Sequence, residues 1–70
     1  MTEVFKTNVQ HSAEAKLLAR FIEWDLPDCE ASFDLEDCDK ILRVQSQGAF
    51  LNREKIISLF NHLGFTAEVL

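Results

Sequence analysis

The chain has 70 residues, of which 47% are hydrophobic, and its twelve acidic and seven basic side chains give a formal net charge of −5. This size fits a single domain spanning residues 1–70 and leaves no room for a second one. The negative charge repels phosphate backbones and anionic lipid surfaces, which excludes nucleic acid as a partner.

Two features of the sequence bear on the cellular compartment. Residues 1–6 lack the apolar core of a signal peptide, and no later stretch approaches the roughly 18 apolar residues of a membrane-spanning helix. Cys29 and Cys38 are too few for a secreted disulfide scaffold, and they form no closely spaced thiol motif. We therefore expect a cytoplasmic protein with reduced thiols and no membrane insertion.

The first predicted element is a strand over residues 3–9. Apolar and polar positions alternate there, with Phe5, Thr7 and Val9 on one side. Because successive side chains of a strand point to opposite faces, these three are expected to face the core.

A helix is predicted next, from Ser12 to about Trp24, and it must end before Pro27. The Ser12 hydroxyl is expected to cap the first turn, where Glu14 adds negative charge near the positive end of the helix dipole. Trp24 and Leu26 are expected to cover one end of the core. The apolar residues that cluster at helical spacing, and so define the predicted core face, are Leu17, Leu18, Phe21 and Ile22.

The middle of the chain is typical of a β-hairpin. Residues 29–36 alternate between a core side, which begins with Cys29, and an acidic solvent side, and this alternation predicts a second strand. A polar turn over residues 36–39 leads to a third strand over residues 40–46, with Leu42 and Val44 facing the core. Cys29 is therefore interpreted as a small core residue.

A second helix and a short strand complete the chain. Asn52 is expected to cap this helix, and Gly64 to end it in a left-handed conformation. The final strand is predicted over residues 66–70. The order strand, helix, strand, strand, helix, strand predicts an α+β, ferredoxin-like βαββαβ fold, a four-stranded antiparallel sheet with two helices on one face. The core stripe of the second helix is predicted to consist of Ile56, Ile57, Phe60 and Leu63.

Several segments of the chain share their pattern with one known family. They are the first strand–helix turn Val9-Gln10-His11-Ser12-Ala13-Glu14, and the later segments Phe33-Asp34-Leu35, Asp39-Lys40-Ile41-Leu42-Arg43-Val44 and Leu63-Gly64-Phe65-Thr66-Ala67-Glu68-Val69. With all six predicted elements, the chain resembles the heavy-metal-associated (HMA) domains of copper chaperones and metal-transporting ATPases. That family carries a Cys-x-x-Cys metal motif at the first turn, where this chain has His11 and Glu14. The resemblance implies the fold and an ancestry in soft-metal trafficking, with the two metal-binding thiols lost.

His11 and Glu14 are the candidate metal ligands. Residues three apart share one face of a helix, so this imidazole and this carboxylate are placed to converge on one cation. The pair suits Zn(II), Ni(II) or Cu(II) better than Cu(I), and useful affinity needs further ligands from water, Cys38 or a second copy of the domain. His62 is a further candidate, in the last turn of the second helix. The alternative interpretation is an exposed turn histidine, with Glu14 and His62 as partners of the helix dipoles.

The predicted function is that of a noncatalytic binding module, because no phosphate-binding glycine loop or catalytic triad pattern is present. The module resembles HMA domains and binds borderline divalent metal ions (zinc, nickel or copper) at most weakly, at the first strand–helix turn. The alternative is a metal-independent domain that binds another protein or senses a small molecule, with Trp24 as a possible protein anchor. The sequence leaves the oligomeric state open, and a stable dimer would favour the sensing domain.

Overall fold

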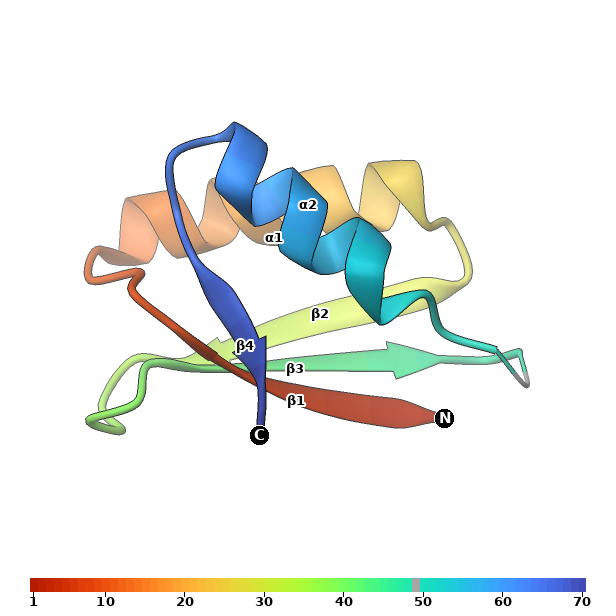
Figure 1. Ribbon diagram of the computed structural model, residues 1–70, viewed down its shortest axis with the longest axis horizontal. Coiled ribbons are helices and arrows are strands. Elements are labelled where there is room, and N and C mark those ends of the chain that lie inside the picture. Colours follow the sequence, from red (N-terminus) through yellow and green to blue (C-terminus); the bar gives the residue numbers. More distant parts are fainter. Residues whose placement is uncertain (49) are drawn as a thin grey trace.

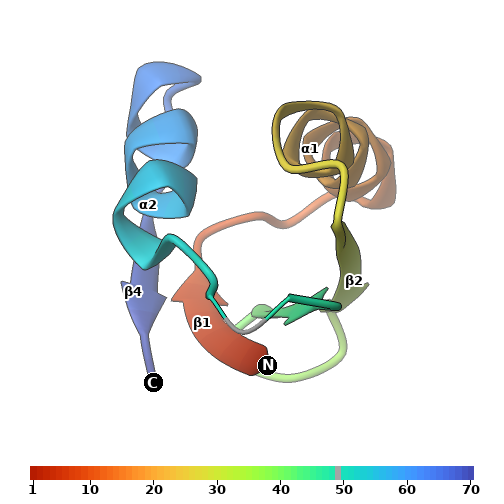
Figure 2. The same cartoon turned by 90° about the vertical axis from the view of Figure 1, so that its right-hand side faces the viewer.

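The computed structural model describes residues 1–48 and 50–70, which form an α+β fold (Figure 1). Within these residues the elements are β1 (Thr2–Thr7), α1 (Ser12–Asp25), β2 (Cys29–Asp34), β3 (Ile41–Ser46), α2 (Arg53–His62) and β4 (Ala67–Val69). The strands form one antiparallel sheet of order β2-β3-β1-β4. Both helices cover the same face of this sheet, which leaves an outer face on the opposite side (Figure 2).

The strands bury the side chains that their alternation predicts. Phe5 and Val9 are completely buried, and Thr7 is 6% exposed. Strand β1 nevertheless ends at Thr7, two residues before the predicted end, because the Val9 N–H donates to the Thr7 hydroxyl at 3.3 Å instead of to a neighbouring strand. Leu42 and Val44 of β3 are completely buried, as predicted.

The predicted hairpin is confirmed as the β2–β3 pair. Its register runs from Cys29 opposite Ser46 to Asp34 opposite Ile41. Cys29 is buried in the core and Cys38 is exposed, and neither described cysteine forms a disulfide. Neither helix of the described residues is long and apolar enough to cross a bilayer.

Helix α2 has the predicted cap at each end. The Lys55 N–H donates to the Asn52 side-chain oxygen at 3.1 Å, and Gly64 has a φ of 89°. Phe60 is completely buried and stacks on Phe33, with 6.3 Å between ring centroids. Leu63 was expected in the core stripe but is 38% exposed, because α2 ends at His62 and Leu63 no longer follows the helical spacing.

The core face predicted for α1 is partly wrong. Its buried residues are Ala15, Leu18 and Ile22, whereas Leu17 and Phe21 are 56% and 40% exposed. Consecutive residues of a helix point about 100° apart, so two adjacent apolar residues cannot both face the sheet directly. The core face of α1 therefore contains Leu18 and Ile22. Their apolar neighbours Leu17 and Phe21 lie on a side of the helix that is open to solvent.

Both ends of α1 also differ from the sequence-based expectation. Trp24 is 86% exposed and does not cover the core, because it lies on the outer side of the helix; Leu26 does pack against the core. Ser12 is the first helical residue and not the cap. The N-cap is His11, whose extended backbone (φ −114°, ψ 137°) places its carbonyl to accept the Ala15 N–H at 3.0 Å.

Candidate functional site

Three connections of the chain meet at one end of the sheet: the β1–α1 turn, the β2–β3 hairpin and the segment before β4 (Figure 1). The Thr7 N–H donates to the Asp39 carbonyl at 3.1 Å, which joins the first two. The Thr66 N–H donates to the Asn8 side chain at 2.9 Å, which joins the first and the third. This end is where the sequence places its candidate metal ligands.

His11 and Glu14 lie at the beginning of α1, as the sequence predicts. His11 is exposed, and over the described residues its side chain makes no capping hydrogen bond to the helix. Glu14 is half-buried in the first turn, where its charge complements the helix dipole. His62 is exposed in the last turn of α2, at the end of the dipole that favours a basic side chain.

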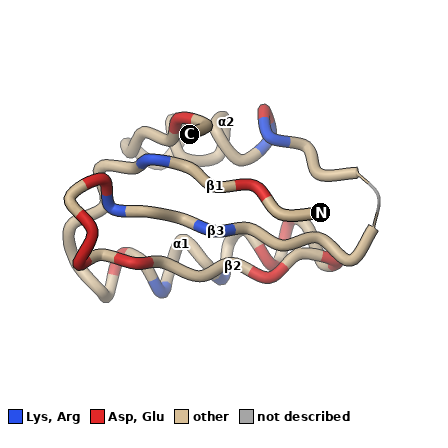
Figure 3. The backbone as a smooth tube through the Cα atoms, turned by 90° about the horizontal axis from the view of Figure 1, so that it is seen from below, with Lys and Arg blue, Asp and Glu red and all other residues tan. Residues whose placement is uncertain are grey.

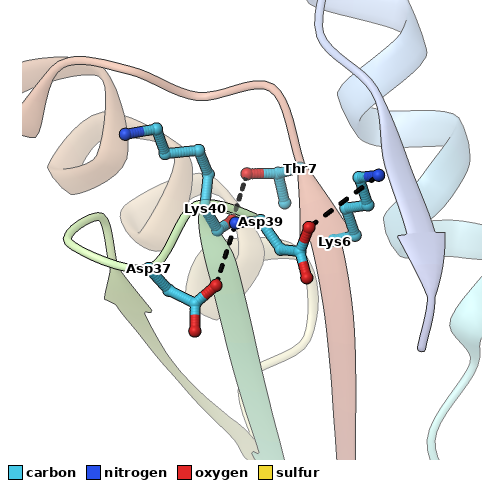
Figure 4. A network of polar contacts seen from close by, with 5 residues as sticks. All are labelled: Lys6, Thr7, Asp37, Asp39 and Lys40. Carbon is cyan, nitrogen blue, oxygen red and sulfur yellow. Dashed lines mark hydrogen bonds and ion pairs between the residues drawn. The ribbon is translucent and has the colours of Figure 1, made fainter.

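The hairpin turn gathers a different set of potential ligands. Among the described residues, the group of three or more donor side chains within mutual reach is Asp37, Cys38 and Asp39, with one donor atom of each within 4.8 Å of the others. Asp37 accepts the Asp39 N–H at 2.9 Å, and Asp39 forms an ion pair with Lys6 at 3.8 Å (Figure 4). These contacts account for the carboxylates as turn-forming groups. Neither His11 nor Glu14 belongs to this group.

The same network anchors the hairpin to β1. The Thr7 hydroxyl donates to the Lys40 carbonyl at 2.6 Å, and Lys40 itself has a positive φ of 49° (Figure 4). The Lys40 ammonium group donates to the Leu35 carbonyl at 3.0 Å and so closes the turn from the other side. The polar side chains at this end thus have a demonstrable structural role in holding the connections together.

The helix layer carries a feature that the sequence-based interpretation missed. We call three exposed residues of α1 the apolar stripe: Leu17, Phe21 and Trp24, which lie four and three residues apart. Their side chains are 56%, 40% and 86% exposed. Such spacing places side chains on one side of a helix. The available signal was the pair of adjacent apolar residues at 17–18 and at 21–22, which gives α1 more apolar side chains than one core face accommodates.

A groove runs between the apolar stripe and α2. One part, of about 340 Å³, is lined by Phe21, Trp24, Asp25 and Leu59. An adjoining part of about 310 Å³ shares Asp25 and Leu59 with it and is lined otherwise by residues of α2. Asp25 and Lys55 form an exposed ion pair across the groove at 3.6 Å. The groove therefore has an apolar section and a polar section.

Charge is divided unevenly between the helices and the rest of the chain. Helices α1 and α2 together carry four basic and four acidic side chains. The remainder of the chain has three basic and eight acidic side chains, so it accounts for the whole net charge of −5. Seen from the outer face of the sheet, acidic positions occur along β2 and in the hairpin (Figure 3). The helices are thus electrically balanced, and the negative charge belongs to the strands and, for the larger part, to the connections.

Comparison with family models, curated proteins and solved structures finds no match for this chain. The resemblance to HMA domains therefore rests on the residues of the sequence that carry it.

Proposed function

We propose that this chain is a noncatalytic, ferredoxin-like module that binds an amphipathic helix of a partner protein through the apolar stripe of α1 and the adjacent groove. The fold assignment is supported by the element order βαββαβ together with the strand order β2-β3-β1-β4, a split arrangement in which β3 separates β1 from β2. The free thiols are in keeping with the reducing environment of the cytoplasm.

The observation that carries the proposal is the exposure of Trp24, at 86%, together with Phe21 and Leu17 on the same side of α1. Burying one large apolar side chain is worth about 1.5–3 kcal/mol, and the stripe gains only part of this within the domain, with Trp24 gaining least. Tryptophan is also among the residues that dominate binding energy at protein interfaces. The stripe is therefore suited to gain its burial from a partner.

The geometry of the surface favours a helix as the partner. The stripe residues are four and three positions apart, the spacing at which side chains of packed helices interdigitate. The groove beside Phe21 and Trp24 offers about 340 Å³ for an apolar anchor. Because α1 and α2 carry equal numbers of basic and acidic side chains, the net charge of the domain does not oppose docking there.

Trp24 is the only tryptophan of the chain, so its fluorescence reports on this surface alone. We expect a synthetic helical peptide of zero net charge, with leucines at the i, i+3, i+4 and i+7 positions, to shift the emission to shorter wavelength in a saturable manner. Leu17→Glu should abolish the shift, whereas Asn61→Glu, which adds the same charge to α2 at an exposed position outside the groove lining, should preserve it. No saturation by such peptides at millimolar concentration would contradict the proposal. A shift produced by protein concentration alone would also contradict it, because a second copy would then cover the stripe.

Weak divalent-metal binding at the first strand–helix turn is a second candidate function. It is supported by the exposed His11 side chain, which is free of a capping role among the described residues, and by Glu14 in the following turn. Amide NMR titration of the reduced protein with Zn(II), and with Cu(I) under anaerobic conditions, tests it. Saturable shifts limited to residues 10–15 and lost in His11→Ala, with His62→Ala as the matched control, would support it. Shifts that persist in His11→Ala would exclude this site.

A further inference from the structure

Strand β2 forms one edge of the sheet, and within the described residues it pairs with β3 alone. In an antiparallel ladder, alternate residues direct both backbone groups toward the neighbouring strand, and the residues between them direct both groups away. Ala31 belongs to the second kind, because its N–H donates to a carboxylate of α1. Phe33, two residues further along β2, has the same phase. The edge thus presents the backbone groups of Ala31 and Phe33 to a further strand.

Glu23 of α1 covers part of this edge. Its carboxylate oxygen Oε2 accepts the Ala31 N–H at 3.1 Å, and the bond is exposed to solvent. The oxygen occupies the position that the carbonyl oxygen of an added strand would take. Because an exposed hydrogen bond contributes only modestly to stability, a strand that brings its own carbonyl can replace Glu23 at a modest cost, and Glu23→Ala would remove that cost.

Two adjoining hollows lie beside β2 near the Glu23–Ala31 bond. The first, between α1 and β2, measures about 370 Å³ and is mainly apolar. Towards the beginning of β2 a second hollow of about 440 Å³ shares Ala31 and Ser32 with the first. Since every second side chain of an added strand would point towards α1, the first hollow would receive those side chains. Its apolar lining consists of Ala15, Ala19, Ala31, Phe33 and Leu35, and the small alanines leave the space open.

The outer face of the same strand is acidic. Glu30 and Asp34 are exposed there, β2 carries no basic residue, and Arg43, opposite Ser32 on β3, offsets part of the charge (Figure 3). A second copy of the chain, paired antiparallel through β2, would bring these acidic side chains together, and like charges on paired strands are destabilising. A strand with basic side chains on this face would be attracted instead. Charge therefore selects a different chain over a second copy.

We propose that the β2 edge binds an extended segment of another protein in which Lys or Arg alternates with apolar residues, and that Glu23 protects Ala31 when the segment is absent. The apolar side chains enter the hollow between α1 and β2, and the basic side chains lie beside Glu30 and Asp34. The backbone of the segment pairs with Ala31 and Phe33, which extends the sheet by one strand. This surface lies on the opposite side of α1 from Asp25, and it is independent of the proposed helix-binding groove.

The acetylated and amidated hexapeptide Lys-Val-Lys-Val-Lys-Val is a suitable probe, and amide NMR a suitable readout. We expect saturable shifts along β2, with slower hydrogen exchange at Ala31 and Phe33 than in the free protein. Glu23→Ala should bind the peptide about threefold to tenfold more tightly, the range that corresponds to one hydrogen bond released. Glu14→Ala removes the same charge from α1 without uncovering the edge, and it should not tighten binding.

Further variants separate this surface from the helix layer. The double variant Glu30→Gln, Asp34→Asn should weaken peptide binding about threefold or more, whereas Leu17→Glu, in the apolar stripe, should leave it unchanged. A peptide with Glu in place of Lys should not bind. The proposal is overturned if the basic peptide fails to bind Glu23→Ala at millimolar concentration, or if its shifts centre on Trp24. It is equally overturned if Glu23→Ala dimerises through β2 without peptide, because a second copy would then be the occupant.

Discussion

Helices α1 and α2 cover the same face of the sheet, yet they distribute their apolar side chains differently (Figure 2). Helix α2 turns Ile56 and Phe60 into the core, where they are 1% and 0% exposed. Helix α1 also has a buried face, but it leaves Leu17, Phe21 and Trp24 on its outer side. The apolar content of α2 is thus largely explained by folding, and that of α1 is not.

The two helices also differ in how their ends are capped. Asn52 caps the beginning of α2, and Gly64 follows its end in the left-handed conformation. At the beginning of α1 stands His11, and no side chain of the described residues caps the helix there. Helix α2 is thus built for stability, whereas α1 keeps exposed side chains that a partner or ligand would use. Changes in α2 should therefore affect unfolding, and changes on the outer side of α1 should affect binding.

The largest effect is expected for Phe60→Ala in α2. Phe60 is completely buried and stacks on Phe33, so truncation removes buried area and leaves a cavity. The free energy of unfolding, measured by urea denaturation, should fall by about 3–5 kcal/mol. Phe21→Ala on α1 is the matched control and should cost much less, because Phe21 is already 40% exposed. Equal losses in the two variants would show that Phe21 contributes as much to the core as Phe60 does.

Gly64→Ala should have the next largest effect. Gly64 has a φ of 89°, and a methyl group added to it would meet no atom within 4 Å, so the cost is conformational and not steric crowding by neighbours. We expect a loss of about 1–2 kcal/mol in the free energy of unfolding. Gly48→Ala is the control, since the added methyl would make only ordinary contacts, at 3.7 Å with the Ser46 hydroxyl and at 4.0 Å with the Phe50 backbone nitrogen. A loss at Gly48 as large as that at Gly64 would contradict this account.

The helix caps provide a smaller and sharper test. Asn52→Ala removes the acceptor for the Lys55 N–H and should lower the free energy of unfolding by about 1 kcal/mol. His11→Ala changes the N-cap of α1 without removing a side-chain cap bond, so its effect should stay within about 0.5 kcal/mol. Thermal or urea denaturation of both variants under the same conditions gives the difference. A cost for His11→Ala equal to that of Asn52→Ala would show that His11 also stabilises its helix.

The strands and turns were predictable because their signals are local. Phe5 and Thr7 face the core because the side chains of a strand alternate, and this holds wherever the sheet packs. Gly64 and Asn52 likewise act on backbone groups a few residues away. The exposure of Leu17 was not predicted, because hydrophobic character alone does not tell which of two adjacent apolar residues of a helix meets the sheet.

Less of the candidate sites than of the fold could be predicted from the sequence. The position of His11 at the start of α1 followed from the strand–helix pattern, but its neighbours in space did not. The protection of Ala31 by Glu23 depends on how α1 lies beside β2, which brings together residues from different elements. Such a contact depends on the packing of the whole domain, and no spacing in the sequence encodes it.

The smallest effect on stability, and the sharpest contrast with Phe60, is expected for Trp24→Ser. Trp24 is the largest apolar side chain of α1, yet at 86% exposure it has little buried area to lose. Its replacement should change the free energy of unfolding by no more than about 0.5 kcal/mol, measured by circular dichroism because the fluorophore is removed. A loss of 2 kcal/mol or more would mean that Trp24 covers the core in solution, as the sequence alone suggested. Binding of the helical peptide can be followed by calorimetry. If stability is preserved while this binding is lost, then the apolar stripe of α1 serves association and not folding.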